Sequence, residues 1–517
     1  MTIGGVGMRR VLGLEPASHS FPKGEGLRAF VLGLVASLAL PPLHVIPVLF
    51  VAVPGLLVLV GRAPSLWRAS RLGFLFGFGM HLVGLYWITE AILLESARYW
   101  WLVPLAVPAL SALLSVFIAI PVALCWTKTG WRRVAVLAGA WVLFDLARQF
   151  VGTGFPWNPW GSVWAVPGGF GDVMIQPAAW VGTPGLTLLT VLAAALPWLG
   201  WRCGMASLAG LVLWAGAGLW RLREPDPAGP GITAVLVQGN LVHGSLRDRT
   251  TAEAAFRRQL QLSAEGVAQA GARAGGRPSV VIWPESAGVY LLEEDAGARE
   301  AIAQAIRPAL GSIVGALRWP DRGAPPWNSM IAMGKDGTVG GTYDKWHLVP
   351  FGEFAPSWVP LSIQIVPGVF AFGTGPKTLS LPGVPAFGGL ICYETIYPGQ
   401  VVDEANRPEW LVNVTNDSWF GNSTGPRQHL TGSRLRAVEE GLPLMRAANT
   451  GISAGFDARG RELGRLTVGE TGVLVLDIPA RRPPTSFGRL GLVIPGLLAA
   501  MVLISGLTGR RRAVDHL

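Results

Sequence analysis

The sequence contains little charge. Only 14% of its 517 residues are Asp, Glu, Lys or Arg, and 50% are hydrophobic. Soluble proteins carry about a quarter charged residues. The deficit is concentrated in residues 1–220 and in a short stretch near the end. This distribution excludes a wholly soluble chain and indicates a membrane protein with a soluble insert.

Cysteine is also scarce, and its spacing argues against a disulfide framework or a metal site. The three cysteines, Cys125, Cys203 and Cys392, are far apart and form no CxxC pair. Cys125 and Cys203 fall in or beside apolar segments, where a free thiol is usually a small buried hydrophobe. We therefore expect no metal and no cofactor, and Cys392 is the one cysteine in the polar part of the chain.

Apolar runs of about 20 residues predict membrane-spanning helices. About eight are expected, near 29–43, 45–60, 72–93, 101–126, 134–147, 177–199, 204–220 and 487–508. Pro41-Pro42 predicts a tight break between the first two. The spans divide the chain into an N-terminal membrane domain at 1–220, a soluble domain at 221–486, and a C-terminal helix with a basic tail at 487–517.

The basic residues predict how these spans are oriented. With the N-terminus inside, the inner loops hold fourteen of them: Arg9, Arg10, Lys23, Arg28, Arg62, Arg68, Arg71, Lys128, Arg132, Arg133, Arg202, Arg510, Arg511 and Arg512. The opposite short loops, 94–100 and 148–176, hold only Arg98 and Arg148. Lys and Arg accumulate on the cytoplasmic side, so the soluble domain is expected on the outer face. Because the net charge of +10 is scattered beside spans rather than gathered in a stripe, nucleic acid is not an expected partner.

The soluble part has the pattern of a layered α/β domain. Short β-branched runs occur at 232–237, 279–283, 311–317, 329–333, 388–392 and 410–414, and helical patterns at 252–272 and 428–441 separate some of them. Strands of that length alternating with helices favour an α/β fold.

Three of these segments end in reactive side chains, where chemistry usually lies in such folds. Glu285 lies in the segment VVIWPES, Lys345 in YDKWHLVPFGE and Cys392 in GGLICYET. Each has an ordinary alternative. Glu285 would cap a following helix, Lys345 would be a solvated loop residue, and Cys392 would pack in the core.

Together, the three residues suit nucleophilic chemistry at the thiol. A thiol attacks only as thiolate, and a neighbouring base or cation lowers the cost of forming it. Glu285 would accept the thiol proton and later return one. The Lys345 ammonium would stabilise the thiolate and the oxyanion of a tetrahedral intermediate.

The motifs WPES, YDKWHLVPFGE and CYE, in that order, resemble the nitrilase superfamily, with its Glu-Lys-Cys triad and αββα sandwich. VQGN (237–240), HLVPFGEF (347–354), NDSWFG (416–421), GPRQHL (425–430) and RAANTGIS (446–453) resemble one branch of it, the bacterial apolipoprotein N-acyltransferases. That family also places seven spans before and one span after an exported nitrilase-like domain, so the resemblance covers essentially the whole chain.

The resemblance implies roles for the reactive residues. Glu285 would be the general base, Lys345 the oxyanion-stabilising lysine and Cys392 the nucleophile. Three further residues match motif positions and would order the site: Glu353, Tyr393 and Glu394.

The resemblance also implies an activity. Cys392 would take an acyl chain from a membrane phospholipid as a thioester and pass it to the α-amino group of a lipoprotein's N-terminal diacylglyceryl-cysteine. The phospholipid, the diacylated apolipoprotein and the bilayer would be the partners. The location would be the bacterial inner membrane, with the catalytic domain on the periplasmic face.

Two other functions remain open at this point. A membrane-anchored nitrilase-type amidase would use water in place of the amine. A membrane scaffold or transporter would carry an inactive nitrilase domain, although all three triad residues are retained.

Several segments are expected to face lipid or substrate. The apolar stretch 354–372 is interpreted either as an arm that dips into lipid or covers the site, or as packing against its own domain. The segment GFPWNPWG (154–161) is placed beneath the domain, beside a lipid entrance. His81, Tyr86, Trp87 and Glu90 are placed on the third span, with Trp87 as an interfacial anchor. After VQGN the family usually has a tryptophan, which LVHGSLRDRT lacks.

Overall fold

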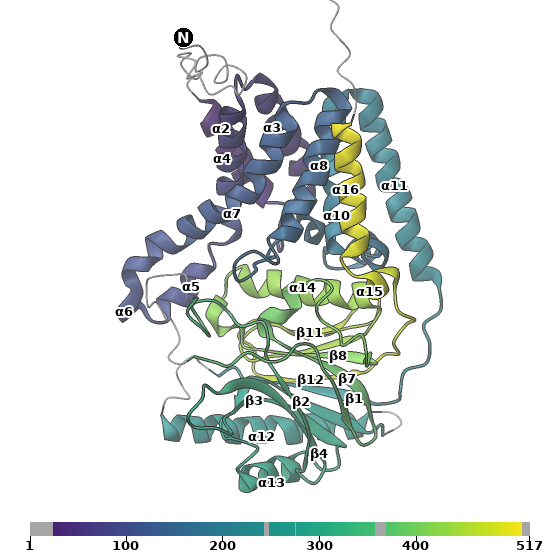
Figure 1. The fold of residues 1–517 in the computed structure, drawn as a ribbon. Helices are drawn as coiled ribbons and strands as arrows, with labels where there is room; N and C mark the ends of the chain where they lie inside the picture. Colours follow the sequence, from purple (N-terminus) through teal and green to yellow (C-terminus); the bar gives the residue numbers. More distant parts are fainter. Residues whose placement is uncertain (1–23, 242–247, 274–275, 357–368, 509–517) are drawn as a thin grey trace, which may run out of the picture.

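The computed structural model describes residues 24–241, 248–273, 276–356 and 369–508. It has two halves, which Figure 1 shows one above the other: a bundle of helices, and an α/β half built of two sheets. The chain returns at its end to the bundle through α16 (Val493–Leu507), which packs against α8 (Gly130–Ala147). The helical half is therefore built from both ends of the sequence.

The helical half contains long and short helices. Besides α8 and α16, its α-helices are α2 (Glu25–Ser37), α3 (Leu49–Arg62), α4 (Leu66–Gly84), α5 (Ile88–Leu93), α6 (Ser96–Tyr99), α7 (Val103–Trp126), α9 (Gly169–Met174), α10 (Ala178–Ala195) and α11 (Trp201–Arg223). By length and composition, three helical stretches among the described residues are sufficient to cross a membrane: Ser96–Trp126, Ala178–Leu199 and Trp201–Arg223. Ile46–Arg62 and Val493–Leu507 are shorter apolar helices.

The third expected span, 72–93, is wrong in its extent. Helix α4 ends at Gly84, and the chain turns before α5 begins at Ile88. Tyr86 and Trp87 therefore lie in the turn, and Glu90 lies on a different helix from His81. From this turn the Trp87 indole donates a hydrogen bond to Gln428 of the α/β half, 3.1 Å away.

The α/β half consists of two six-stranded sheets. The first has the order β12-β1-β2-β3-β4-β5 and the second β11-β10-β9-β8-β7-β6. The strands are β1 (Thr233–Gln238), β2 (Ser279–Gly288), β3 (Gly311–Arg318), β4 (Trp327–Gly334), β5 (Val339–Asp344), β6 (Thr378–Leu381), β7 (Val384–Ile391), β8 (Trp410–Thr415), β9 (Leu444–Ala448), β10 (Ser453–Phe456), β11 (Glu462–Leu466) and β12 (Gly472–Asp477). Each of the six predicted runs corresponds to one of these strands.

The sheets face each other between two helical layers, which confirms the expected αββα sandwich. Side chains alternate along β1: Leu236 packs between the sheets, whereas Val235 packs beneath α12 (Arg249–Ala272). Helix α13 (Ala296–Ala305) shares that outer layer, and α14 (Gly425–Glu440) covers the other sheet. Figure 1 places α14 between the sheets and the helical half.

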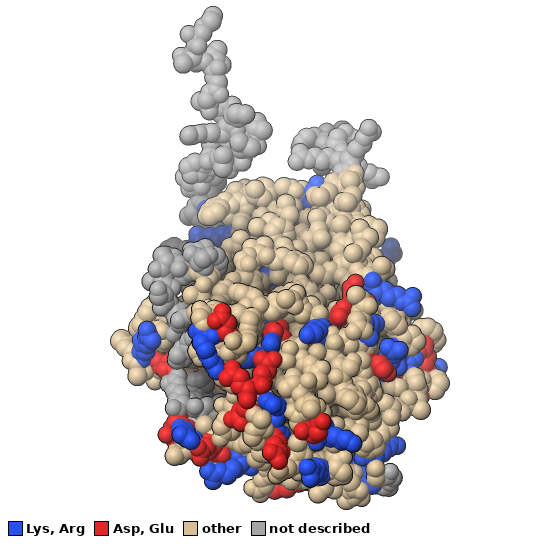
Figure 2. All heavy atoms as spheres, turned by 60° about the horizontal axis from the view of Figure 1, so that its bottom comes forward, with Lys and Arg blue, Asp and Glu red and all other residues tan. Residues whose placement is uncertain are grey.

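Charge separates the two halves on the surface. On the face that Figure 2 draws, Lys, Arg, Asp and Glu side chains gather over the α/β half, while the helical half above it shows only a few basic groups. The exposed side chains of α11 and α16 include Leu213, Trp220, Leu497 and Met501. A surface of that composition matches hydrocarbon rather than water.

Candidate active site

Glu285 lies within β2 rather than after it. The strand continues to Gly288, with a break in its pairing to β3 between Trp283 and Gly288. A side chain at Gly315 on β3 would lie 2.3 Å from the Pro284 carbonyl oxygen, so only glycine allows this irregular segment to pack. The next helix, α13, begins at Ala296, and the alternative that Glu285 caps a helix is therefore wrong.

Lys345 lies between two carboxylates. Its Nζ is 3.1 Å from Glu285 Oε1 and 2.9 Å from Glu353 Oε1, and its side chain is only 1% exposed. Asn328 Nδ2 donates to the same two oxygens, at 2.7 and 2.9 Å. Burial opposes the charged form of Lys345, but the two carboxylates outweigh it and raise the pKa well above its usual value. Lys345 is therefore an ammonium, and the alternative of a solvated loop lysine is wrong.

Cys392 is the first residue of a sharp turn. It follows β7 directly and begins the short helix η6 (Cys392–Ile396) with a φ of 49°. A residue with a side chain seldom adopts this left-handed conformation, and such outliers concentrate at functional sites. The strand, turn and helix therefore hold the thiol in a defined direction.

The Cys392 thiol is buried beside the two charged groups. Burial is the main reason that its pKa is raised, the Glu285 carboxylate raises it further, and the Lys345 ammonium acts in the opposite direction. In the resting protein the group is thus a thiol. A base must remove its proton before it attacks, and Glu285 is the carboxylate whose charge acts most strongly on it.

Glu394 connects the backbone around Lys345 to the turn at Cys392–Ile396, called the cysteine turn below. One of its oxygens accepts the backbone N–H of Trp346 at 2.8 Å, and the other accepts the Tyr343 hydroxyl at 2.7 Å and the Ile391 N–H at 2.6 Å. These donors flank Lys345 on one side and Cys392 on the other. Burial raises the pKa of Glu394 to about 7, although its donors favour the ionised form.

Tyr393 ties the same turn to the helical half. Its hydroxyl donates to the Gly154 carbonyl at 2.9 Å, and the Tyr397 hydroxyl donates to the same oxygen at 3.0 Å. Trp157 donates to Gln428 on α14 at 2.8 Å and is 3% exposed. The segment 154–161 thus packs between the two halves, as its expected place beneath the domain requires.

A polar group that sequence reasoning missed lies beside Cys392. Asp417 follows β8, His429 lies on α14 and Arg446 lies on β9. NDSWFG, GPRQHL and RAANTGIS marked these positions as family motifs without assigning them a role. Asn328, which bonds to both glutamates, had no signal because it is one amide in an ordinary strand.

Cys392, Asp417 and His429 each bring one possible metal ligand within 4.8 Å of the others. However, Arg446 Nη2 donates to Asp417 Oδ2 at 2.7 Å and lies 3.1 Å from His429 Nδ1. A cation bound here would face this guanidinium, so the geometry does not favour a metal.

Two segments for which the sequence makes predictions lie partly outside the residues that the structure describes. Residues 357–368 of the proposed arm and residues 242–247 of LVHGSLRDRT lie outside the described residues. The described ends of the arm meet, since the Phe354 and Phe372 rings are 5.1 Å apart.

The facing sheets, the helical layers and the buried cysteine turn define a nitrilase-like α/β domain joined to a bundle of apolar helices. The sequence model for the apolipoprotein N-acyltransferase N-terminal domain matches residues 32–196, and that for carbon-nitrogen hydrolase matches residues 245–482. The apolipoprotein N-acyltransferase of Bradyrhizobium diazoefficiens is 38% identical over 95% of this chain and 96% of its own. That of Allorhizobium ampelinum is 37% identical over 87% and 89%. The chain belongs to the apolipoprotein N-acyltransferase family.

A solved amidase from Nesterenkonia aligns with a TM-score of 0.37 and 19% identity, covering 50% of this chain and 93% of that chain.

Proposed function

We propose that this protein transfers a fatty acyl chain from a membrane phospholipid, through a thioester on Cys392, to the α-amino group of the N-terminal diacylglyceryl-cysteine of a lipoprotein. One observation carries the proposal: a buried Glu285–Lys345–Glu353 cluster lies beside a cysteine turn that is hydrogen-bonded to the helical half. The names of the relatives support the same activity.

In the first step Glu285 takes the thiol proton and Cys392 Sγ attacks the ester carbonyl of the phospholipid. Oε1 of Glu285 already accepts from Lys345 and Asn328, whereas Oε2 accepts only the Asn416 N–H among the described residues. Oε2 therefore keeps a lone pair for the proton. The C–S bond forms, the ester C–O bond breaks, and Glu285 returns the proton to the departing lysophospholipid oxygen.

In the second step the neutral amine attacks the thioester. The C–N bond forms and the C–S bond breaks, while Glu285 takes a proton from the amine and returns one to the cysteine sulfur. A thioester divides a difficult exchange of ester for amide into two easier steps.

Lys345 stabilises the oxyanion in both steps. Two of its three N–H donors bond to Glu285 and Glu353. The third has no partner in the part of the chain that the structure describes, and we assign it to the developing negative charge. Glu353 fixes the lysine, since its second oxygen is itself held by the Val349 N–H at 2.8 Å. Glu394 and Tyr393 order the turn through the contacts described above.

The helical half, on this proposal, spans the inner membrane about eight times. Its domain covers 1–220, the catalytic domain covers 221–486 on the periplasmic face, and the final helix and tail cover 487–517. The basic loops support this orientation. Both substrates are lipids, so the turn must lie at the membrane surface, and the bonds of Tyr393 and Tyr397 to Gly154 keep it against the helical half.

Mass spectrometry of the full-length protein tests the proposal. Incubation with phospholipid alone should leave a long-chain acyl adduct on the Cys392 peptide, cleaved by hydroxylamine as thioesters are. Cys392→Ala should lose the adduct. Cys203→Ala is the matched control, because Cys203 is a free, half-buried cysteine in the helical half, and it should keep the adduct.

The same experiment separates the alternatives. An amidase-type hydrolase would release free fatty acid rapidly without an amine acceptor, and the adduct would not accumulate. A non-catalytic protein would form no adduct at all. Full complementation of a strain lacking the activity by Cys392→Ala would also reject the catalytic role.

A further inference from the structure

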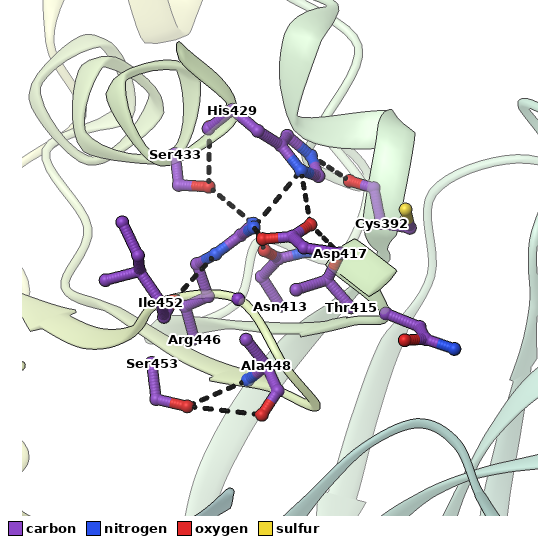
Figure 3. A network of polar contacts seen from close by, with 12 residues as sticks. Cys392, Asn413, Thr415, Asp417, His429, Ser433, Arg446, Ala448, Ile452 and Ser453 are labelled. Atoms are coloured by element: carbon purple, nitrogen blue, oxygen red, sulfur yellow. Dashed lines mark hydrogen bonds and ion pairs between the residues drawn. The ribbon is translucent and has the colours of Figure 1, made fainter. Parts of the chain in front are cut away.

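A polar cluster beside Cys392 has no part in the steps above. It consists of Asp417 at the start of η7 (Asp417–Phe420), His429 on α14 and Arg446 on β9. Each is at most 1% exposed. Burying such groups is costly unless they are paired. Figure 3 shows that they bond to one another and that His429 also bonds to the backbone of Cys392.

The neighbours of His429 determine where its ring carries a proton. Nε2 is 2.9 Å from the Cys392 carbonyl oxygen. A carbonyl oxygen only accepts, so Nε2 must carry a hydrogen. Nδ1 is 3.1 Å from Arg446 Nη2, which only donates, and 3.0 Å from Asp417 Oδ1.

Both charge states of the ring keep the bond to Cys392. In the neutral ring, Nδ1 accepts from Arg446, and Asp417 Oδ1 is satisfied by the Thr415 hydroxyl at 3.0 Å. In the charged ring, Nδ1–H donates to Asp417 instead. Burial, followed by the charge of Arg446, lowers the pKa of His429 and so favours the neutral ring.

Arg446 holds the remainder of the cluster in place. Besides Asp417, it donates to Ser433 Oγ at 3.2 Å, to the Ile452 carbonyl at 3.2 Å and to the Asn413 side chain. Its position therefore depends on three elements, β8, α14 and β9, as well as the loop that follows β9. The His429 ring is further enclosed by Trp157 and Phe420, with ring centroids 5.8 Å from its own in both cases.

The carbonyl that His429 holds belongs to the residue with the left-handed backbone. A donor on this oxygen fixes the plane of the peptide that joins Cys392 to Tyr393, because that peptide is rigid. Figure 3 shows the carbonyl oxygen facing His429 and the sulfur turned away from the ring. Without the donor, an uncommon conformation at φ 49° would lose one of its constraints.

We propose that His429 is a positioning residue for the nucleophile: its Nε2–H holds the Cys392 carbonyl, and Asp417 and Arg446 hold its ring. The inference rests on the proposed function, in which Cys392 attacks the phospholipid ester. His429 itself touches neither the substrate nor the reacting sulfur in this role.

The Asp417 carboxylate is one of the charges that raise the pKa of the Cys392 thiol, and its pairing with Arg446 limits that effect. A carboxylate oxygen of Asp417 lies within 4.8 Å of Cys392 Sγ, and an unpaired negative charge there would disfavour a second one. The ion pair at 2.7 Å offsets this charge. The cluster thus supplies a hydrogen-bond donor to the turn, and its one carboxylate is paired with a guanidinium.

Replacing His429 by Gln or by Asn tests the roles of its two ring nitrogens separately. In His429→Gln the side-chain amide reaches the former position of Nε2, whereas in His429→Asn it reaches only that of Nδ1. With full-length protein and phospholipid alone, the Gln variant should retain most of the wild-type rate of adduct formation. The Asn variant should be slower by about 10²-fold, the effect of a small misplacement of a reacting group.

A distant histidine provides the matched control. His44 in the helical half also bonds to a backbone carbonyl, through Nδ1 to Val163 at 2.8 Å. In His44→Gln the amide does not reach the former position of Nδ1, so this bond is lost, and the variant should form the adduct at the wild-type rate. Equal rates for the Gln and Asn variants of His429 would overturn the proposal. An absence of adduct in the wild type would instead reject the proposed function.

A measurement on the unsubstituted protein covers the case in which His429→Asn fails to fold. The chain has seven histidines, so nitrogen NMR of selectively labelled protein, with His429→Gln for assignment, can report which nitrogen of His429 is protonated. Protonation at Nε2 is expected. A neutral ring protonated at Nδ1 alone would overturn the proposal whatever the variants do.

Discussion

Two glycines in the loop that follows α8 provide a test of how the helical half positions Cys392. Gly152 and Gly154 have similar left-handed backbones, with φ values of 66° and 72°. A methyl group on Gly152 would meet nothing within 4 Å, whereas one on Gly154 would lie 2.4 Å from the Gln149 carbonyl oxygen and 3.2 Å from Tyr397 Cε1. The Gly154 carbonyl accepts both tyrosine hydroxyls of the cysteine turn.

Gly152→Ala and Gly154→Ala should therefore cause similar backbone strain but differ in their effect on activity. Each places an L-residue in the left-handed region, at about 1–2 kcal/mol. Only the second forces the loop to move, by roughly 1 Å if the contact is to relax to ordinary van der Waals distance. That movement displaces the acceptor of Tyr393 and Tyr397 and, through Gln149, the bond from its Nε2 to the Pro398 carbonyl at 3.1 Å.

We expect Gly154→Ala to form the Cys392 adduct about 10²-fold more slowly, since a shift of about 1 Å near a reacting group has an effect of that size. Gly152→Ala should stay close to the wild-type rate. The assay is the time course of the adduct with phospholipid alone, with the melting temperature measured in parallel. Similar rates for the two variants at similar melting temperatures would refute the idea that this loop positions the nucleophile.

Two further predictions concern the buried charges. Lys345→Met should lower the free energy of unfolding by about 3–5 kcal/mol, because it leaves two buried carboxylates unpaired, and it should abolish the adduct. In thermal unfolding Lys345→Arg should be the more stable of the two variants. The reverse order would contradict the pairing of Lys345 with Glu285 and Glu353. Tyr343→Phe removes a donor that lowers the pKa of Glu394, so the acid limb of adduct formation, expected near pH 7, should move to higher pH. The shift should be about one pKa unit, since a hydrogen bond to a charged group contributes about 1.5 kcal/mol, and an unchanged limb would show that Glu394 does not set it.

The sequence was sufficient for six of the twelve strands, β1, β2, β3, β4, β7 and β8, because their β-branched runs are short and bounded by polar turns. The runs at 279–283 and 388–392 correspond to β2 and β7, whose ends approach each other across the sandwich and bring Glu285 near Cys392. Periodicity failed in the third span, because the apolar residues continue through the turn at 85–87 and hide it. It also failed for β11, whose residues are largely exposed and alternate without a clear buried face.

The supporting residues could not be predicted for a different reason. Asn328, His429 and Arg446 act through contacts between elements that are distant in the chain, and no local pattern reports such contacts. His429 bonds to a carbonyl 37 positions away, and Arg446 bonds to a carboxylate 29 positions away. Only the overlap of His429 and Arg446 with family motifs marked them at all.

Helix α14 shows why the two halves must be regarded as one structure. Nearly all its residues are buried, including charged ones, so it has no solvent face of the kind that an amphipathic helix presents. Arg434 donates to the Ala165 and Val166 carbonyls, and Glu439 accepts from the backbone N–H and the hydroxyl of Thr183.

The partners of these charged groups lie in the helical half, so removing that half would leave the groups without the bonds that offset their burial. The same helix carries His429 on the side of the cysteine turn. The helical half is therefore more than an anchor: it completes the hydrogen bonding of the layer on which the nucleophile rests.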